Sequence, residues 1–153
     1  MNIETTTIAE AREWLEDRLD EGAECPCCTQ NVKVYRRKIT SPMARGLLKQ
    51  YREVGRRPAH SASLVRDETH EFSQLAWWGL IVEEPGTRDD GGRAGWWSIT
   101  ALGESFALDL VRLPKYVRIY DGRVLETEDD GETVDIHDAL SERFNYGDLM
   151  AGV

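Results

Sequence analysis

The sequence lacks long hydrophobic runs and has few cysteines. It contains 153 residues with three cysteines, and no apolar stretch approaches the roughly 18 residues of a membrane span. Residues 1–20 carry eight charges and no apolar core of a secretion signal. We therefore expect a cytoplasmic protein with no membrane partner.

Residues suited to catalysis are also scarce. The three histidines, His60, His70 and His137, are scattered along the chain, and no nucleophile falls in a recognisable motif. Two pairs of neighbouring acids lie in predicted turns, where nothing removes water from them. We predict that the protein has no catalytic residues and is not an enzyme.

Positive charge is the minority sign, and it is concentrated in one segment. The net charge of the chain is -9, but residues 33–57 alone carry +8, against -6 for residues 1–32 and -11 for residues 58–153. Charges more than about 8 Å apart are largely screened at physiological salt, so this segment can bind a polyanion locally. The alternative, that the segment pairs with its acidic flanks, stays open. Its nine cations are Lys33, Arg36, Arg37, Lys38, Arg45, Lys49, Arg52, Arg56 and Arg57.

The three cysteines are grouped in Cys25-Pro26-Cys27-Cys28. The spacing of Cys25 and Cys28 is typical of one knuckle of a zinc ribbon, in which a tight turn directs two thiolates at a tetrahedral ion. A complete site needs two further ligands, and the remaining candidates form no second pair. Zinc at Cys25 and Cys28 and a simple reduced turn both stay open, and no other cofactor is indicated.

The N-terminal part is predicted to be one helix and one strand. Thr7 and Glu10 have the spacing of a capping box, and apolar residues follow at helical spacing as far as Gly22, which suits the end of a helix. Residues 32–39 alternate apolar and basic residues at their start, which favours a short strand.

Residues 41–112 are predicted to contain helices over 41–54, 58–66 and 67–78, two strands and a further helix. Ser41-Pro42 begins the first helix, and Gly79 ends the third. Strands at 80–83 and 96–99 enclose a Gly-rich loop with Arg93, a candidate minor-groove contact. Thr100 begins the helix that follows. Trp77, Trp78, Trp96 and Trp97 flank this loop, and strand alternation sends Trp96 and Trp97 to opposite faces.

The C-terminal part contains a strong hairpin signal. Asp121-Gly122 separates two alternating runs over 116–126, and a last helix is expected over 136–144. We therefore predict an α+β protein with three segments in one compact unit: an N-terminal helix and cysteine knuckle (1–40), a winged helix-turn-helix core (41–112), and a C-terminal extension of a β-hairpin and a helix (113–153).

Residues 75–106, LAWWGLIVEEPGTRDDGGRAGWWSITALGESF, resemble the end of the recognition helix, the wing and the next helix of MarR- or PadR-like winged-helix regulators. The resemblance covers about residues 41–110 and implies a winged helix that binds DNA, often as a homodimer. The whole chain also resembles small proteins encoded by actinobacteria and their phages, which implies no activity. The predicted recognition helix departs from the family because Asp67, Glu68 and Glu71 place acids where bases and phosphates would lie.

Two functions follow from these features. The first is a DNA-binding winged helix, such as a transcriptional regulator, that contacts the phosphates of double-stranded DNA through residues 33–57 and Arg93. The alternative is a protein-interaction module, phage-encoded in one version, that docks on a partner protein through its acidic or tryptophan-rich surface.

Overall fold

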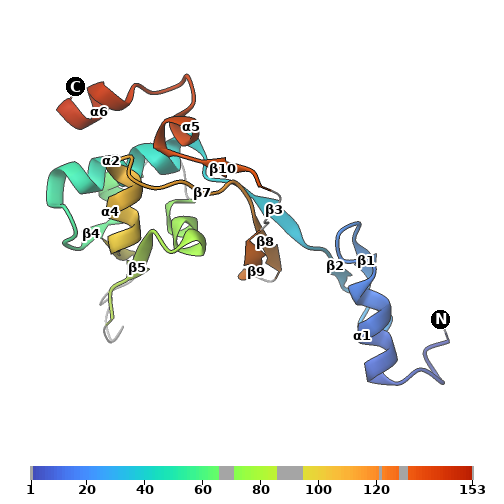
Figure 1. Ribbon diagram of the computed structural model, residues 1–153. Coiled ribbons are helices and arrows are strands. Elements are labelled where there is room, and N and C mark those ends of the chain that lie inside the picture. The colour runs from blue at the N-terminus through green and yellow to red at the C-terminus, as the bar shows by residue number, and fades with distance from the viewer. Residues whose placement is uncertain (1, 66–70, 86–94, 121, 128–130, 153) are drawn as a thin grey trace. The chain divides into compact units, whose positions relative to one another are not determined.

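The structure is a computed structural model that describes residues 2–65, 71–85, 95–120, 122–127 and 131–152 (Figure 1). The chain divides into two compact units: unit 1 comprises Met1–Arg37 and Val117–Thr127, and unit 2 comprises Lys38–Tyr116 and Glu128–Val153. The predicted extension 113–153 is thus shared between the two units. The α+β class is confirmed by the helices and small antiparallel sheets of both units.

Helix α2 (Ser41–Val54) is the central element of unit 2. The Thr40 side chain caps it by accepting a hydrogen bond from the Met43 N–H at 3.4 Å. Thr40 lies one residue before Ser41, at which the sequence predicts the start of the helix. Met43, Leu47 and Leu48 are fully buried. Helices α3 (Ser61–Val65), α4 (Ala101–Ala107), α5 (Ile136–Leu140) and α6 (Tyr146–Ala151) pack against α2.

A three-stranded sheet lies beside α2. Its strands β4 (Ala59–His60), β5 (Ile81–Glu83) and β6 (Trp96–Ile99) pair antiparallel in the order β4-β6-β5. Ile81 and Ile99 pair with each other and are buried, whereas Val82 is 54% exposed and Trp96 is 36% exposed. This alternation places the apolar face of the sheet on the core and leaves an aromatic and aliphatic patch outside.

The 3-10 helix η1 (Phe72–Trp78) leads into β5. Phe72, Leu75 and Trp78 are buried, and Gly79 ends the helix with a left-handed φ of 77°. Helix α4 packs closely on the next strand, since a Cβ at Gly103 would lie 2.1 Å from the Leu80 carbonyl oxygen. No side chain larger than hydrogen fits there without movement of the backbone.

The C-terminal part of unit 2 closes the other side of α2. Strands β7 (Leu113–Pro114) and β10 (Thr133–Val134) pair, and a capping box between Asp135 and Asp138 begins α5. The Tyr146 hydroxyl of α6 donates a hydrogen bond of 2.8 Å to the Ala107 carbonyl. No helix among the described residues is long and apolar enough to cross a bilayer.

Unit 1 combines helix α1 (Ile8–Glu16) with two small sheets. Strands β1 (Ala23–Glu24) and β2 (Asn31–Val32) form a hairpin, and β3 (Tyr35–Arg37), β8 (Val117–Tyr120) and β9 (Arg123–Thr127) form a sheet in the order β3-β8-β9. The predicted capping box of Thr7 and Glu10 is present in α1. The buried apolar residues of this unit are Ala11, Val32, Val34, Val117 and Ile119.

Several predicted elements differ in length. Helix α1 ends at Glu16 and not at Gly22, and the helix capped by Thr100 ends at Ala107, so Leu110 is 72% exposed. The last helix stops at Leu140 because Ser141 adopts a φ of 57°, and the tail forms α6. The described part of the predicted 67–78 helix is the 3-10 helix η1.

Candidate nucleic-acid interface, cysteine turn and pocket

The basic segment belongs to both units. Lys33, Arg36 and Arg37 lie in unit 1, on or next to β3, and all three are exposed. Lys33 and Arg37 lie over the Tyr35 ring in cation–π contacts, with the Lys33 Nζ 5.6 Å and the Arg37 Cζ 5.3 Å from its centroid. The N-terminal end of the segment therefore combines cations with an aromatic side chain that is 50% exposed.

The remaining cations follow α2 in unit 2. Arg45, Lys49 and Arg52 are spaced i, i+4 and i+7, so they occupy one stripe of the helix. The Lys49 Nζ donates to the Ser63 carbonyl of α3 at 3.0 Å, and an Arg52 amino group donates to the Leu149 carbonyl of α6 at 2.9 Å. The stripe is therefore bordered by α3 and α6.

Arg56 and Arg57 extend this stripe beyond the end of α2. Their Nε atoms donate to the Ile99 and Val54 carbonyls at 3.4 and 3.2 Å. Both side chains belong to exposed residues. Because the acceptors are neutral carbonyls, the hydrogen bonds orient the guanidinium groups without cancelling their charge.

The ion pairs of Asp20, Glu132, Asp135 and Asp138 use cations from outside residues 33–57. Asp20 pairs with Arg118 at 2.6 Å, Glu132 pairs with Lys115 at 3.7 Å, and Asp135 and Asp138 share Arg112 at 3.2 Å. Within the segment, Arg52 contacts the neighbouring Glu53 at 3.7 Å. Among the described residues, six cations of the segment have no ion-pair partner: Lys33, Arg37, Lys38, Lys49, Arg56 and Arg57.

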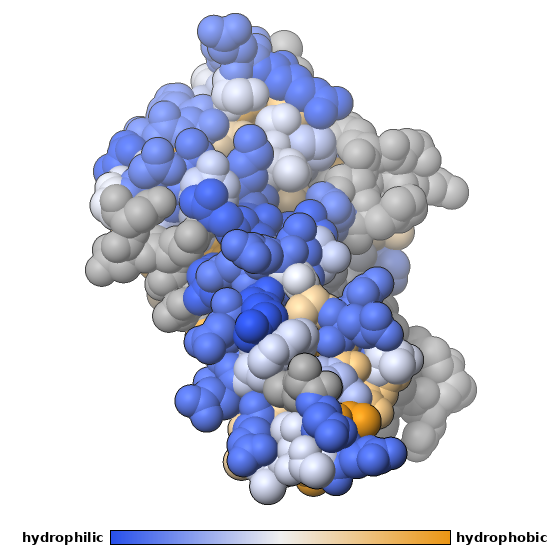
Figure 2. Space-filling model, turned by 90° about the vertical axis from the view of Figure 1, so that its right-hand side faces the viewer, coloured by the Kyte–Doolittle hydropathy of each residue, from blue (hydrophilic) through white to orange (hydrophobic). Residues whose placement is uncertain are grey.

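The regions expected to read DNA in a winged helix are only partly described. Arg93, Asp67 and Glu68 lie outside the described residues. In η1 the buried residues outnumber the polar ones that reach the surface, Ser73 and Gln74, and the exposed Glu71 precedes them. The described residues 71–79 contain no Lys or Arg that could enter a DNA groove. Hydrophilic side chains cover most of the face drawn in Figure 2.

The cysteines lie on the turn that joins β1 to β2. The Cys25 N–H donates to the Gln30 carbonyl at 2.8 Å, and the Thr29 N–H donates to the Cys25 carbonyl at 2.9 Å. All three thiols are free, and Cys27 and Cys28 are exposed. Hydrogen bonds from the backbone N–H groups of Cys28 and Cys27 hold the pKa of the Cys25 thiol below its ordinary value.

The fit of this turn to zinc is incomplete. Backbone N–H groups directed at a sulfur stabilise a thiolate, which is the form that binds metal. However, the described residues include no group of three or more Cys, His, Asp or Glu side chains placed to hold an ion. Zinc binding by Cys25 and Cys28 therefore stays a prediction.

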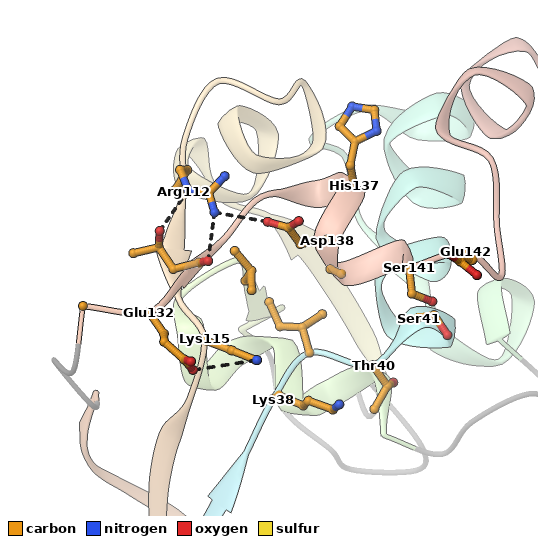
Figure 3. Close-up of a pocket in the computed structure, with 15 residues that line it drawn as sticks. Lys38, Thr40, Ser41, Arg112, Lys115, Glu132, His137, Asp138, Ser141 and Glu142 are labelled. Carbon is orange, nitrogen blue, oxygen red and sulfur yellow. Dashed lines mark hydrogen bonds and ion pairs between the residues drawn. The ribbon is translucent and has the colours of Figure 1, made fainter.

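Unit 2 also contains an open pocket of about 930 Å³ (Figure 3). It lies between the start of α2, the β7–β10 pair and α5. Arg112 is held there by Asp135, Asp138 and Thr133, and the ion pair of Lys115 and Glu132 lies nearby. Cations and carboxylates are equal in number in the lining, which includes Lys38, Arg112, Lys115, Glu132, Asp138 and Glu142.

Asp138 and His137 of this pocket are engaged in structural contacts. The Asp135 N–H, with help from Arg112, keeps the pKa of Asp138 below its ordinary value. The His137 Nε2 lies 3.2 Å from an Asp109 carboxylate oxygen, and Figure 3 shows its ring directed away from Lys38 and Lys115. The pocket can accept a polar molecule, but its described residues place no base beside a nucleophile.

Tyr35 lies within the strand predicted from residue 32 to residue 39, and Lys33, Tyr35 and Arg37 alternate along it. That alternation was the available signal, since positions two apart in an extended chain share a face.

Searches against models of protein families, curated proteins and solved structures found no match to this chain.

Proposed function

We propose that the protein is a winged-helix DNA-binding protein, of the type that acts in transcriptional regulation, and that it contacts phosphates through residues 33–57. The order α2, β4, α3, η1, β5, β6 and the sheet order β4-β6-β5 support the winged-helix assignment, because a helical trio followed by a hairpin is the arrangement of that fold. The assignment gives α2 the place of the first core helix.

The observation that carries this proposal is the set of six cations without ion-pair partners among the described residues. In a chain with a net charge of -9, cations that paired with the acidic flanks would be unavailable to DNA. No described acid pairs with these six cations, so they keep their charge for phosphates. Phosphate contacts fix the position of a protein on DNA without reading its sequence.

The test is the salt dependence of binding to duplex DNA. We expect fluorescence anisotropy of a labelled duplex to show binding at low salt that weakens steeply as salt rises, with a slope of about -0.9 per phosphate contact. The double variants K33Q/R37Q and R56Q/R57Q should each flatten the slope by up to about two such steps, because each removes two unpaired charges.

Lys115→Gln is the matched control, since Lys115 is a cation outside residues 33–57 that is already paired with Glu132. It should leave the slope unchanged. Absence of binding at low salt, or equal slopes for the wild type and both double variants, would show that residues 33–57 do not contact DNA.

The alternative function, a protein-interaction module, is favoured by the exposed face of the β4-β6-β5 sheet. Val82 and Trp96 are exposed there, and the His60 ring contacts the Trp96 ring edge-on at 5.6 Å. Exposed aromatic residues of this kind anchor protein partners. A stoichiometric partner that stays bound after nuclease treatment, and that the variant Trp96→Ala loses, supports this alternative.

A further inference from the structure

Tyr35 has an unusual position for a tyrosine of a small sheet. Strand β3 pairs with β8 on one side and is an edge strand in the order β3-β8-β9. Tyr35 pairs with the buried Ile119, but its own side chain is 50% exposed. The ring therefore leaves the covered part of the sheet at its open edge.

The two neighbouring cations are positioned around this ring by the local fold. The aliphatic stem of Lys33 lies against Gly22, where a Cβ would contact it at 3.4 Å. Arg37 follows Tyr35 by two positions on the same face of β3. Both cations lie over the ring, and no described acid pairs with either of them. A base that stacks on the ring therefore takes the place of a cation, which is then free to contact a phosphate.

An aromatic face between cations is complementary to an unpaired nucleotide, which has a flat base and a phosphate on each side. Base stacking on an aromatic side chain contributes about 1–3 kcal/mol per base, and an arginine guanidinium can stack on the same base. A base inside a duplex is already stacked on its neighbours and offers no free face. An acidic peptide would gain from the cations but not from the ring.

We propose that Tyr35 is a base-stacking residue and that the β3 edge prefers single-stranded over double-stranded nucleic acid. The inference rests on the proposed function only in taking phosphates as the partners of Lys33 and Arg37. It adds an aromatic contact that duplex binding through phosphates does not require.

The experiment compares a labelled single strand of fifteen thymidines with a duplex of equal length, using the full chain at low salt and fluorescence anisotropy. We expect Tyr35→Ala to weaken single-strand binding about 5- to 150-fold, which corresponds to the loss of one stacked base. Duplex affinity should change by less than about twofold. Tyr35→Phe, which keeps the ring, should bind the single strand like the wild type.

Tyr120→Ala is the matched control, because Tyr120 belongs to the same sheet, is 38% exposed and points to the opposite face from Tyr35. It should leave both affinities unchanged. Circular dichroism of each variant checks that the fold is retained.

The other outcomes separate this inference from the proposed function. If Tyr35→Ala binds the single strand as well as the wild type does, while duplex binding keeps its salt dependence, the stacking role is wrong and the phosphate contacts remain. If neither nucleic acid binds, both proposals fail. If polyglutamate binds as tightly as the single strand and Tyr35→Ala changes neither affinity, the site recognises acidic chains through its cations instead.

Discussion

The two units of the molecule differ in how much apolar surface they bury. Unit 2 contains the fully buried side chains Met43, Leu47, Leu48, Phe72, Leu75 and Phe106, packed around one central helix. In unit 1 the buried apolar residues are small or β-branched, and Ile8 of α1 is 68% exposed. Backbone hydrogen bonds of short strands and turns make up much of unit 1.

This difference indicates a division of roles. Domains of fewer than about 40 residues seldom fold without disulfides, metals or partners, because they bury too little surface. Unit 1 is close to that limit, and it holds both the cysteine turn and the aromatic edge with Lys33 and Arg37. Unit 2 has a conventional core, and the cations Arg45, Lys49 and Arg52 lie along the surface stripe of α2. We expect ligands to stabilise unit 1 more than unit 2.

The largest effect should come from breaking the core of unit 2. Phe106 is fully buried, so Phe106→Ala should lower the free energy of unfolding by about 3–5 kcal/mol through lost contacts and a cavity. Hydrogen exchange followed by mass spectrometry should show faster exchange throughout α2 and α4. Amides of the β8–β9 hairpin in unit 1 should keep their wild-type protection.

Leu110→Ala provides the control for this prediction, because Leu110 is 72% exposed and its truncation should change stability by less than about 0.5 kcal/mol. Equal loss of protection in both units of Phe106→Ala would show that they unfold together as one cooperative unit.

Zinc binding tests whether a ligand stabilises unit 1, which buries less apolar surface than unit 2. If Cys25 and Cys28 bind zinc as two of its four ligands, we expect zinc to bind more weakly than at a closed four-ligand site and to be removed easily by a chelator. Zinc at about 100 times its dissociation constant would stabilise unit 1 by about 2.7 kcal/mol. Titration with a chromophoric zinc indicator measures the binding.

Cys27 provides the control within the same turn. C25S and C28S should lose the zinc binding of the wild type, whereas C27S should keep it. Zinc that survives long dialysis against a chelator, or binding that depends on Cys27, would contradict a half-site made by Cys25 and Cys28.

The smallest losses of stability are expected from removing the N-cap of one helix in each unit. Thr7→Ala in α1 and Asp135→Ala in α5 each remove the N-cap of a capping box, which costs about 1 kcal/mol. The loss should be larger for Asp135, because Asp135 also pairs with Arg112 at 3.2 Å. Hydrogen exchange of the first turn of each helix measures the two losses, and equal losses would show that the Arg112 contact adds nothing.

The pH dependence of the α5 capping box follows from Asp138, whose folded pKa lies below its ordinary value. An acid with a lowered pKa stabilises the fold fully above its unfolded pKa of about 3.9. This contribution disappears as the pH falls through the folded pKa. The stability difference between the wild type and Asp138→Asn should therefore be present at pH 7 and vanish in strong acid.

The start signals of helices were the most predictable features of the fold. The capping box at Thr7 and the cap at Thr100 depend on neighbours within a few residues, and the structure contains both. The hairpin signal before Arg123 is equally local, and the hairpin of β8 and β9 is present. The ends of helices were less predictable. Asp109 and Ser141 adopt left-handed φ angles that no local pattern signals, and these turns direct the following chain onto the rest of unit 2.

The candidate sites were likewise predictable from local features but not from contacts between distant residues. Residues 33–57 were recognisable from charge alone, whereas the pairing of the acids with Arg112, Lys115 and Arg118 depends on residues that are distant in sequence. The structure therefore shows which cations of residues 33–57 have no ion-pair partner among the described residues. Arg93 lies outside the described residues, and its predicted groove contact stays a prediction.

The sequence by itself determined the α+β class, the positions of the caps and the concentration of positive charge, because these depend on local chemistry and composition. The tertiary structure decided that the 117–127 hairpin joins β3 and that Tyr35 lies on an open sheet edge with two cations over its ring. It also decided that Asp20, Glu132, Asp135 and Asp138 pair with cations from outside residues 33–57. The physical reason is that strand pairing and ion pairing join residues far apart in the chain, and no local pattern specifies which partners meet.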